Sequence, residues 1–129
     1  LHSPGFCTCR TDSSTSFPDA SSTSRLYVQV RSETSSKLTN FSLQLETKGG
    51  HDILGRQGTY TAPVKIPNDG EWHNVSVSWT DAVLTWRGEK IKGPALTTQL
   101  DKITSIGLST YFPGSVGAFD MDIRSLWAE

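Results

Sequence analysis

Apolar and polar residues alternate along four stretches of the chain, at positions 26–31, 41–46, 75–80 and 119–124. A period of two places one set of side chains on a buried face of a strand and the other set in solvent. This pattern is typical of antiparallel sheets with one wet side, so we predict a strand at each stretch. The side chains that we expect inside the core are those of Leu26, Val28, Leu43, Leu45, Val75, Val77, Ile106, Leu108, Phe119, Met121 and Ile123.

Turn signals rich in glycine and proline separate the apolar stretches, at 48–50, 67–70, 92–94 and 112–114. The only helical signal is a short turn over 97–102. Seven or eight short strands with such turns between them predict an all-β fold, an antiparallel two-sheet β-sandwich. Beyond the four alternating stretches, we expect strands near 5–11, 58–66, 83–87 and 103–110.

The length and charge of the chain restrict its class. Its 129 residues fit a single domain, 1–129, in which the Ser- and Thr-rich stretch 12–24 is a surface loop. Apolar runs are far shorter than a bilayer span, so we do not expect the chain to cross a membrane. The net charge is −1, and the sequence shows no basic stripe of the kind that binds nucleic acid. No charged-then-apolar leader opens the sequence, which predicts a mature form or a fragment.

Two cysteines, Cys7 and Cys9, lie one residue apart. On an extended strand this spacing rarely reaches disulfide geometry, so the chain is not built on a disulfide framework. The pair would form a metal site only together with His2, His51 or His73. No second ligand pair shows zinc spacing, which favours two ordinary strand thiols and no metal site.

Catalytic and cofactor motifs are absent from the sequence. There is no nucleophile elbow, phosphate-binding loop, dinucleotide fingerprint or zinc-protease helix motif. Asp120 and Asp122 share one face of a predicted strand and could bind Ca²⁺ or act as an acid/base pair, but a solvated pair is the commoner arrangement. His73, beside Trp72, is typical of a surface or capping residue. We therefore predict no enzyme, no catalytic residue and no cofactor.

The most distinctive segment is 71–88, which contains Trp72, Trp86 and Arg87. An arginine between tryptophan and glycine can stack on an aromatic ring or form a fork with a carboxylate. Two interpretations stay open. In the favoured one, Arg87 locks a loop to the sandwich through backbone carbonyls or an aspartate; in the other, it is an anchor that faces a partner. These three residues are the candidate partner-binding or loop-anchoring positions.

Four segments in order resemble the complex I intermediate-associated protein family. Residues 4–11 (Pro-Gly-Phe-Cys-Thr-Cys-Arg-Thr) are similar to its Gly-Gly-Phe-Ala-Ser-Val-Arg-Thr, and 60–72 to its Tyr…Trp approach to a strand. Residues 79–88 are similar to a Phe-x-x-Phe-x-x-x-x-Arg-Gly segment. Residues 100–123 resemble its closing Ile-x-x-Ile-Gly-Leu and Gly-Pro-Phe-x-Leu-x-Ile. The family has opening strands before the first segment that this chain lacks, so we expect an edge strand or the region 1–10 to contact another chain.

The resemblance implies a galactose-binding-like jelly roll and a role as scaffold, chaperone, assembly factor or accessory subunit. It implies protein partners in an energy-transducing membrane complex, either respiratory complex I or a photosynthetic complex. The expected location is a mitochondrion or plastid, at an aqueous face of a membrane. Related sandwiches bind sugars, so a carbohydrate-binding, lectin-like module is the alternative.

Overall fold

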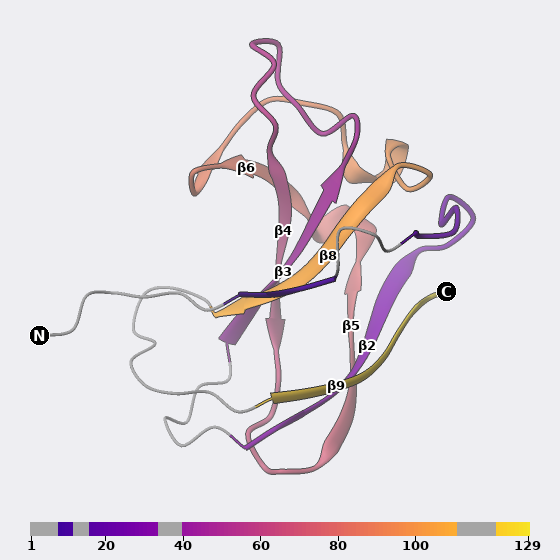
Figure 1. Ribbon diagram of the computed structural model, residues 1–129, viewed down its shortest axis with the longest axis vertical. Coiled ribbons are helices and arrows are strands. Elements are labelled where there is room, and N and C mark those ends of the chain that lie inside the picture. The colour runs from indigo at the N-terminus through magenta and orange to yellow at the C-terminus, as the bar shows by residue number, and fades with distance from the viewer. Residues whose placement is uncertain (1–7, 12–15, 34–39, 111–120) are drawn as a thin grey trace, which may run out of the picture.

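The described parts of the alternating stretches lie in strands of two antiparallel sheets, except residues 79–80, which begin a 3₁₀ turn. The apolar faces of the two sheets form one core (Figure 1). The computed structural model describes residues 8–11, 16–33, 40–110 and 121–129. Nine strands are present in this part of the chain, and the predicted β-sandwich is confirmed. Within these residues the structure contains no helix with the length and hydrophobicity of a membrane span.

The larger sheet has six strands in the order β1-β8-β3-β4-β6-β7. Every neighbouring pair is antiparallel. Its centre is formed by the predicted strands around 41–46, 58–66 and 103–110, which the structure places side by side. The bounds are β1 Thr8–Arg10, β8 Ile103–Thr110, β3 Asn40–Thr47, β4 Thr59–Lys65, β6 Val83–Trp86 and β7 Glu89–Lys90.

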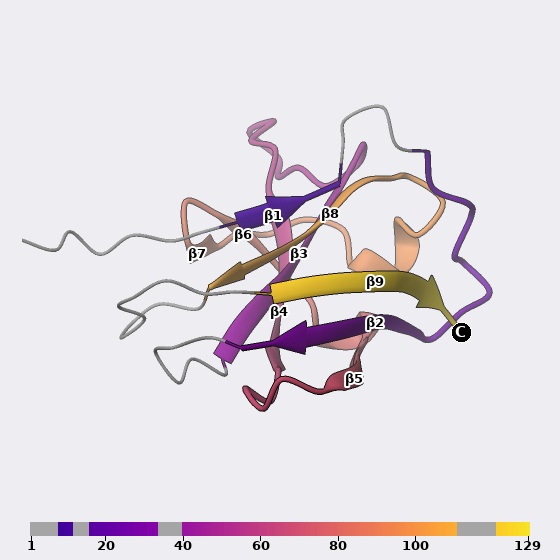
Figure 2. The same ribbon diagram turned by 60° about the horizontal axis from the view of Figure 1, so that its bottom comes forward.

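The smaller sheet has three strands in the order β5-β2-β9. β2 (Arg25–Ser32) is its centre, with β5 (Trp72–Ser78) and β9 (Met121–Ala128) antiparallel on either side. Figure 2 shows this sheet and the strands β1, β8 and β3 as separate layers. Short 3₁₀ turns follow β5 at Trp79–Asp81 and precede β8 at Leu96–Thr98, the second at the edge of the predicted helical turn.

Inward-facing side chains of both sheets fill the core as the period of two predicts. Leu26, Val28, Leu43, Leu45, Val77, Ile106 and Leu108 are all buried, and Val75 and Met121 are half-buried against them. Tyr60 is buried too, and its hydroxyl donates a hydrogen bond to the Pro94 carbonyl 2.6 Å away. Burial raises the pKa of Tyr60.

The expected burial of Ile123 is wrong, because its side chain is 42% exposed. Ile123 pairs with the fully buried Val30, so it faces the gap between the sheets, as the alternation predicted. It is exposed because β9 is the edge of its sheet and no described element covers that flank. The expectation for Phe119 lies outside the described residues.

We predict that Leu45→Ala lowers the free energy of unfolding by about 2–5 kcal/mol, because it leaves a cavity in the centre of the core. Ile53→Ala is the matched control, because Ile53 is fully exposed in a loop. Its effect should stay within about 0.5 kcal/mol. Urea denaturation followed by circular dichroism measures both, and equal effects would contradict the placement of the core.

Candidate interaction surface

Trp72 lies at the start of β5, on the face of the small sheet that points away from the core. It pairs across the sheet with Arg31 of β2. The guanidinium of Arg31 lies 5.0 Å from the Trp72 ring centroid, and that of Arg124 in β9 lies 4.0 Å from it. Both distances allow a cation–π interaction. Three strands therefore supply one cluster of tryptophan and arginine.

A second aromatic pair lies on the same face of the small sheet. The Tyr27 and Trp127 rings stack with centroids 5.4 Å apart and planes 10° apart. Gln29 lies between the two aromatic groups on β2, and Ser125 donates a 3.4 Å hydrogen bond to its amide oxygen. We call this surface, made by Tyr27, Arg31, Trp72, Arg124 and Trp127, the outer face. Tryptophan, tyrosine and arginine are the residues most enriched in binding hot spots.

The two predicted aspartates do not form a described pair. Asp122 forms a 2.5 Å ion pair with Arg31 at the outer face, and Asp120 lies outside the described residues. Asp122 is therefore not a free carboxylate, and it holds the guanidinium of Arg31 in position.

His73 bonds to Asp69, with 2.9 Å between its Nε2 and the carboxylate. The backbone N–H of Glu71 and the His73 ring hold the pKa of Asp69 below its usual value. Among the described residues, no group of three His, Cys, Asp or Glu side chains gathers as a metal site would require. Cys9 belongs to β1, and Cys7 lies outside the described residues.

Trp86 and Arg87 lie in the other sheet, at the turn between β6 and β7. Arg87 and Gly88 have φ angles of 51° and 82°, which fit a two-residue hairpin turn with two left-handed positions. The Arg87 guanidinium lies 4.5 Å from the Trp86 ring centroid. Figure 1 shows this turn and the start of β5 toward opposite ends of the molecule. The sequence candidates thus form two separate clusters rather than one site.

The arginine that locks a loop is Arg56, not Arg87. Arg56 forms a fork with Asp52, with distances of 2.6 Å from Nε and 2.5 Å from Nη2 to Oδ2, and its guanidinium lies 4.7 Å from the Trp86 ring centroid. No carboxylate or carbonyl among the described residues binds Arg87. The sequence analysis left open whether Arg87 stacks on an aromatic ring or forms a fork with a carboxylate. Arg87 stacks on Trp86, and the fork beside that ring belongs to Arg56, which the sequence analysis did not consider.

Asp52 organises the whole turn between β3 and β4. Its Oδ1 accepts the backbone N–H groups of Leu54 (3.0 Å) and Arg56 (2.9 Å), and its side chain is buried. Burial raises the pKa of this carboxyl, but the hydrogen bonds and charge of Arg56 outweigh that effect and leave the pKa below its usual value. Asp52 therefore stays ionised and keeps the turn closed.

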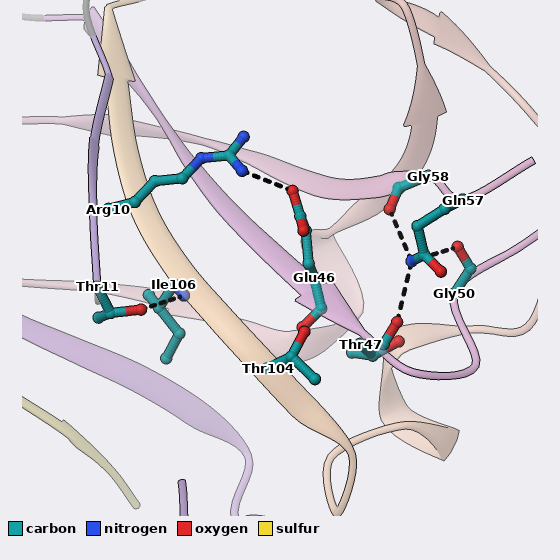
Figure 3. Close-up of polar contacts among 9 residues, drawn as sticks. All are labelled: Arg10, Thr11, Glu46, Thr47, Gly50, Gln57, Gly58, Thr104 and Ile106. Carbon is teal, nitrogen blue, oxygen red and sulfur yellow. Dashed lines mark hydrogen bonds and ion pairs between the residues drawn. The ribbon is translucent and has the colours of Figure 1, made fainter. Parts of the chain in front are cut away.

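Gln57 fixes the base of the same turn (Figure 3). Its side-chain Nε2 donates to the carbonyls of Thr47 (2.9 Å) and Gly50 (3.0 Å). Gly58 also donates its backbone N–H to the Gly50 carbonyl at 2.8 Å. We call residues 51–57 the β3–β4 loop. The sequence analysis did not identify this polar framework, whose one signal was the Asp-x-x-x-Arg spacing of residues 52–56.

An apolar groove of about 370 Å³ opens between the two sheets at the β1 and β9 side. Its apolar lining comes from both sheets and includes Val28, Leu43 and Leu108, together with Ile123 and Leu126 of β9. β1 and β9 are the edge strands here. The groove is therefore a flank of the core, beside two sheet edges, that none of the residues described by the structure covers.

We predict that Asp52→Ala speeds hydrogen exchange at the Leu54 and Arg56 amides, because both lose their acceptor. Asp52→Asn should have a smaller effect, since an amide oxygen can still accept. In the unaltered chain the protection persists at neutral pH and is lost as acid protonates the carboxyl, because its pKa is lowered on folding. Exchange followed by NMR checks this, and unchanged rates in Asp52→Ala would show that the carboxylate does not hold the loop.

Comparison with known proteins agrees with the resemblance seen in the motifs. Among curated proteins, none matches the sequence of this chain. The family model of complex I intermediate-associated protein 30 matches residues 2–123, nearly the whole chain. The protein therefore belongs to the complex I intermediate-associated protein 30 (CIA30) family.

Proposed function

We propose that this chain is a non-catalytic, protein-binding factor that takes part in assembling complex I or a related energy-transducing membrane complex. The family match over residues 2–123 carries the proposal, because the family is associated with complex I assembly. The rigid sandwich is suited to this role, since it presents fixed side chains to a partner at little cost in conformational entropy.

The outer face is the proposed contact with a partner subunit. Trp72, with Arg31 and Arg124 beside its ring, and the Tyr27–Trp127 stack provide large, ordered groups that lose little freedom on binding. Three arginines lie on this surface, counting Arg25, which bonds to Ser76, while the carboxylate of Asp122 is paired with Arg31. An acidic patch on the partner would complement it.

The groove beside β1 and β9 is a second proposed contact. An edge strand presents unpaired backbone groups, and an extended segment of a partner can add to it while its side chains fill an adjacent apolar space. Ile123 and Leu126 of β9 are 42% and 37% exposed in that space. A strand supplied by a partner subunit would cover both side chains. We propose that the chain works in this bound form, at an aqueous face of a mitochondrial or plastid membrane.

Carbohydrate binding is the second candidate. On the outer face, Gln29 and Asn74 pair across β2 and β5 between the two aromatic groups. Aromatic rings beside amide groups are the combination that a sugar ring would need for stacking and hydrogen bonds. The family match favours the assembly role, and titration with monosaccharides and glycans separates the two.

We predict that the tagged chain, expressed in its native cells and purified in mild detergent, brings down subunits of the complex. Trp72→Ala should weaken the association by about 2 kcal/mol, roughly thirtyfold, as expected for a central aromatic contact. The matched control is Trp86→Ala, which also removes a tryptophan beside two arginines but from the other sheet. Recovery of no subunit of a membrane complex would contradict the proposed function.

We predict that the isolated chain associates with itself as its concentration rises, since no described strand pairs with the outer edge of β9. Leu126→Lys should suppress that association, because it places a charge in the groove at a side chain already part-exposed. Val83→Lys is the control, with a similar exposure on another strand. Light scattering after size exclusion decides: a monomer at every concentration would rule out the open edge as a binding element.

A further inference from the structure

Two neighbouring aliphatic side chains stand in solvent at the tip of the β3–β4 loop. Ile53 is 98% exposed and Leu54 is 74% exposed, the highest values among the large apolar residues that the structure describes. Single exposed leucines are common on protein surfaces. Two adjacent aliphatic side chains exposed at one end of a molecule instead indicate a surface that binds an apolar partner. The loop forms the top of the molecule in Figure 1, so its tip is convex rather than the wall of a cavity.

The tip is held in this exposed position. Asp52 binds the backbone N–H groups on both sides of Gly55, which has a φ of 78°, and Gln57 closes the base (Figure 3). A loop fixed in this way cannot fold its aliphatic side chains back onto the sandwich. Because the loop is ordered before it meets a partner, little conformational entropy remains to be lost on binding.

Basic and aromatic groups lie at the base of the loop and on the segments beside it. Trp86 lies beneath the guanidinium groups of Arg56 and Arg87. Gly93 approaches the His51 carbonyl, which brings the segment after β7 beside the loop, and Lys48 donates its N–H to the Lys102 carbonyl. We call residues 48–58 and 86–102 the loop end. The exposed lysines of the loop end are Lys48, Lys90, Lys92 and Lys102.

The loop end is positive on a chain that is otherwise negative. It contains six basic and three acidic residues, whereas the rest of the chain has six basic and ten acidic residues. One of the three acids, Asp52, is paired with Arg56. The loop end therefore carries a net positive charge, which attracts an anionic surface, whereas the rest of the chain is negative in sum.

We propose that the β3–β4 loop docks the protein on an anionic lipid bilayer, with Ile53 and Leu54 inserted at the level of the upper acyl chains. Trp86 and the surrounding arginines and lysines then lie at the headgroup level, where aromatic rings and basic side chains are favoured. A convex apolar tip with a basic collar fits a bilayer interface better than a protein surface, which would need a matching pocket. The inference deepens the proposed location at a membrane and rests on it.

Two aliphatic side chains and a few lysines give a weak, reversible attachment, because even a single myristoyl chain binds membranes only marginally. The attachment would act together with the outer face. A membrane contact raises the local concentration of the chain near membrane-bound partners, as a second binding site does in any linked pair. The loop end and the outer face would then hold the lipid and the protein partner separately.

The test uses the full chain and vesicles, with no other protein present. Vesicles of phosphatidylcholine alone are compared with vesicles that contain about one-third phosphatidylglycerol or cardiolipin, by co-sedimentation. We expect measurable binding only to the anionic vesicles, falling as salt rises. The double variant Ile53→Ser/Leu54→Ser should lose at least about tenfold in partition coefficient, with an unchanged thermal transition because both side chains are exposed.

Two control variants separate the tip from other features. Ile123→Ser/Leu126→Ser removes exposed apolar groups from β9 instead and should bind vesicles like the unaltered chain. Lys90→Glu/Lys92→Glu should reduce anionic binding about tenfold or more, whereas Lys65→Glu, exposed on β4, should not. Equal binding to neutral and anionic vesicles, or equal binding by the Ile53/Leu54 variant, would overturn the proposal.

The alternative to a bilayer is that the tip of the β3–β4 loop inserts into an apolar pocket on a partner protein. It predicts that Ile53→Ser/Leu54→Ser abolishes co-purification in detergent while leaving vesicle binding unaffected, and that outcome also overturns the proposal. If the chain does not bind vesicles, the proposed assembly role is unaffected, because co-purification in detergent needs no bilayer. Failure of co-purification with intact vesicle binding would instead contradict the proposed partners and keep the lipid contact.

Discussion

The structure depends on one mismatch: a six-stranded sheet must bury its apolar face against a sheet of only three strands. Alternating side chains of β3, β4 and β8 require a cover along their whole length, and β5, β2 and β9 supply only part of it. Toward β6, the chain completes the cover with the segment after β7, where Leu96 and Leu100 are buried and Pro94 accepts the Tyr60 hydroxyl. Toward β1, no described element does so, and the groove remains. Both proposed protein contacts follow from the smaller sheet, one on its outer face and the other at its edge.

Stacking of arginine on tryptophan occurs on the surface of both sheets. Arg31 and Arg124 lie over Trp72 in the small sheet, and Arg56 and Arg87 lie over Trp86 in the large one. In each cluster one arginine is also held by an aspartate, Asp122 or Asp52, so the position of its guanidinium is fixed. A stacked guanidinium keeps its charge while it covers the ring. The same pair of residue types therefore provides ordered, cationic surfaces at two ends of the molecule, one suited to an acidic protein and the other to anionic lipid.

The sequence predicted most of the fold because alternation is a local signal. It located β2, β3, β5 and β8 and their inward-facing residues, and the motifs in order indicated the family that the comparison shows. It missed the extension of the last strand to Ala128, because a register shift in the β2–β9 pairing, where Arg124 is skipped, breaks the alternation there. The Asp52–Arg56 fork over the Trp86 ring was missed because the ring and the loop are neighbours in space and not in sequence. Exposure of Ile123 depends on what covers a sheet edge, which no local pattern reports.

The most direct measurement of the assembly role is site-specific photo-cross-linking from the outer face in intact organelles. A photoreactive residue at Gln29, between the two aromatic groups, should cross-link to a subunit of complex I or of a related membrane complex. The same residue at Thr61, which faces outward from the large sheet, should give no such product. Cross-links from Gln29 to no membrane-complex subunit, or identical products from both positions, would contradict the account that this face holds the partner.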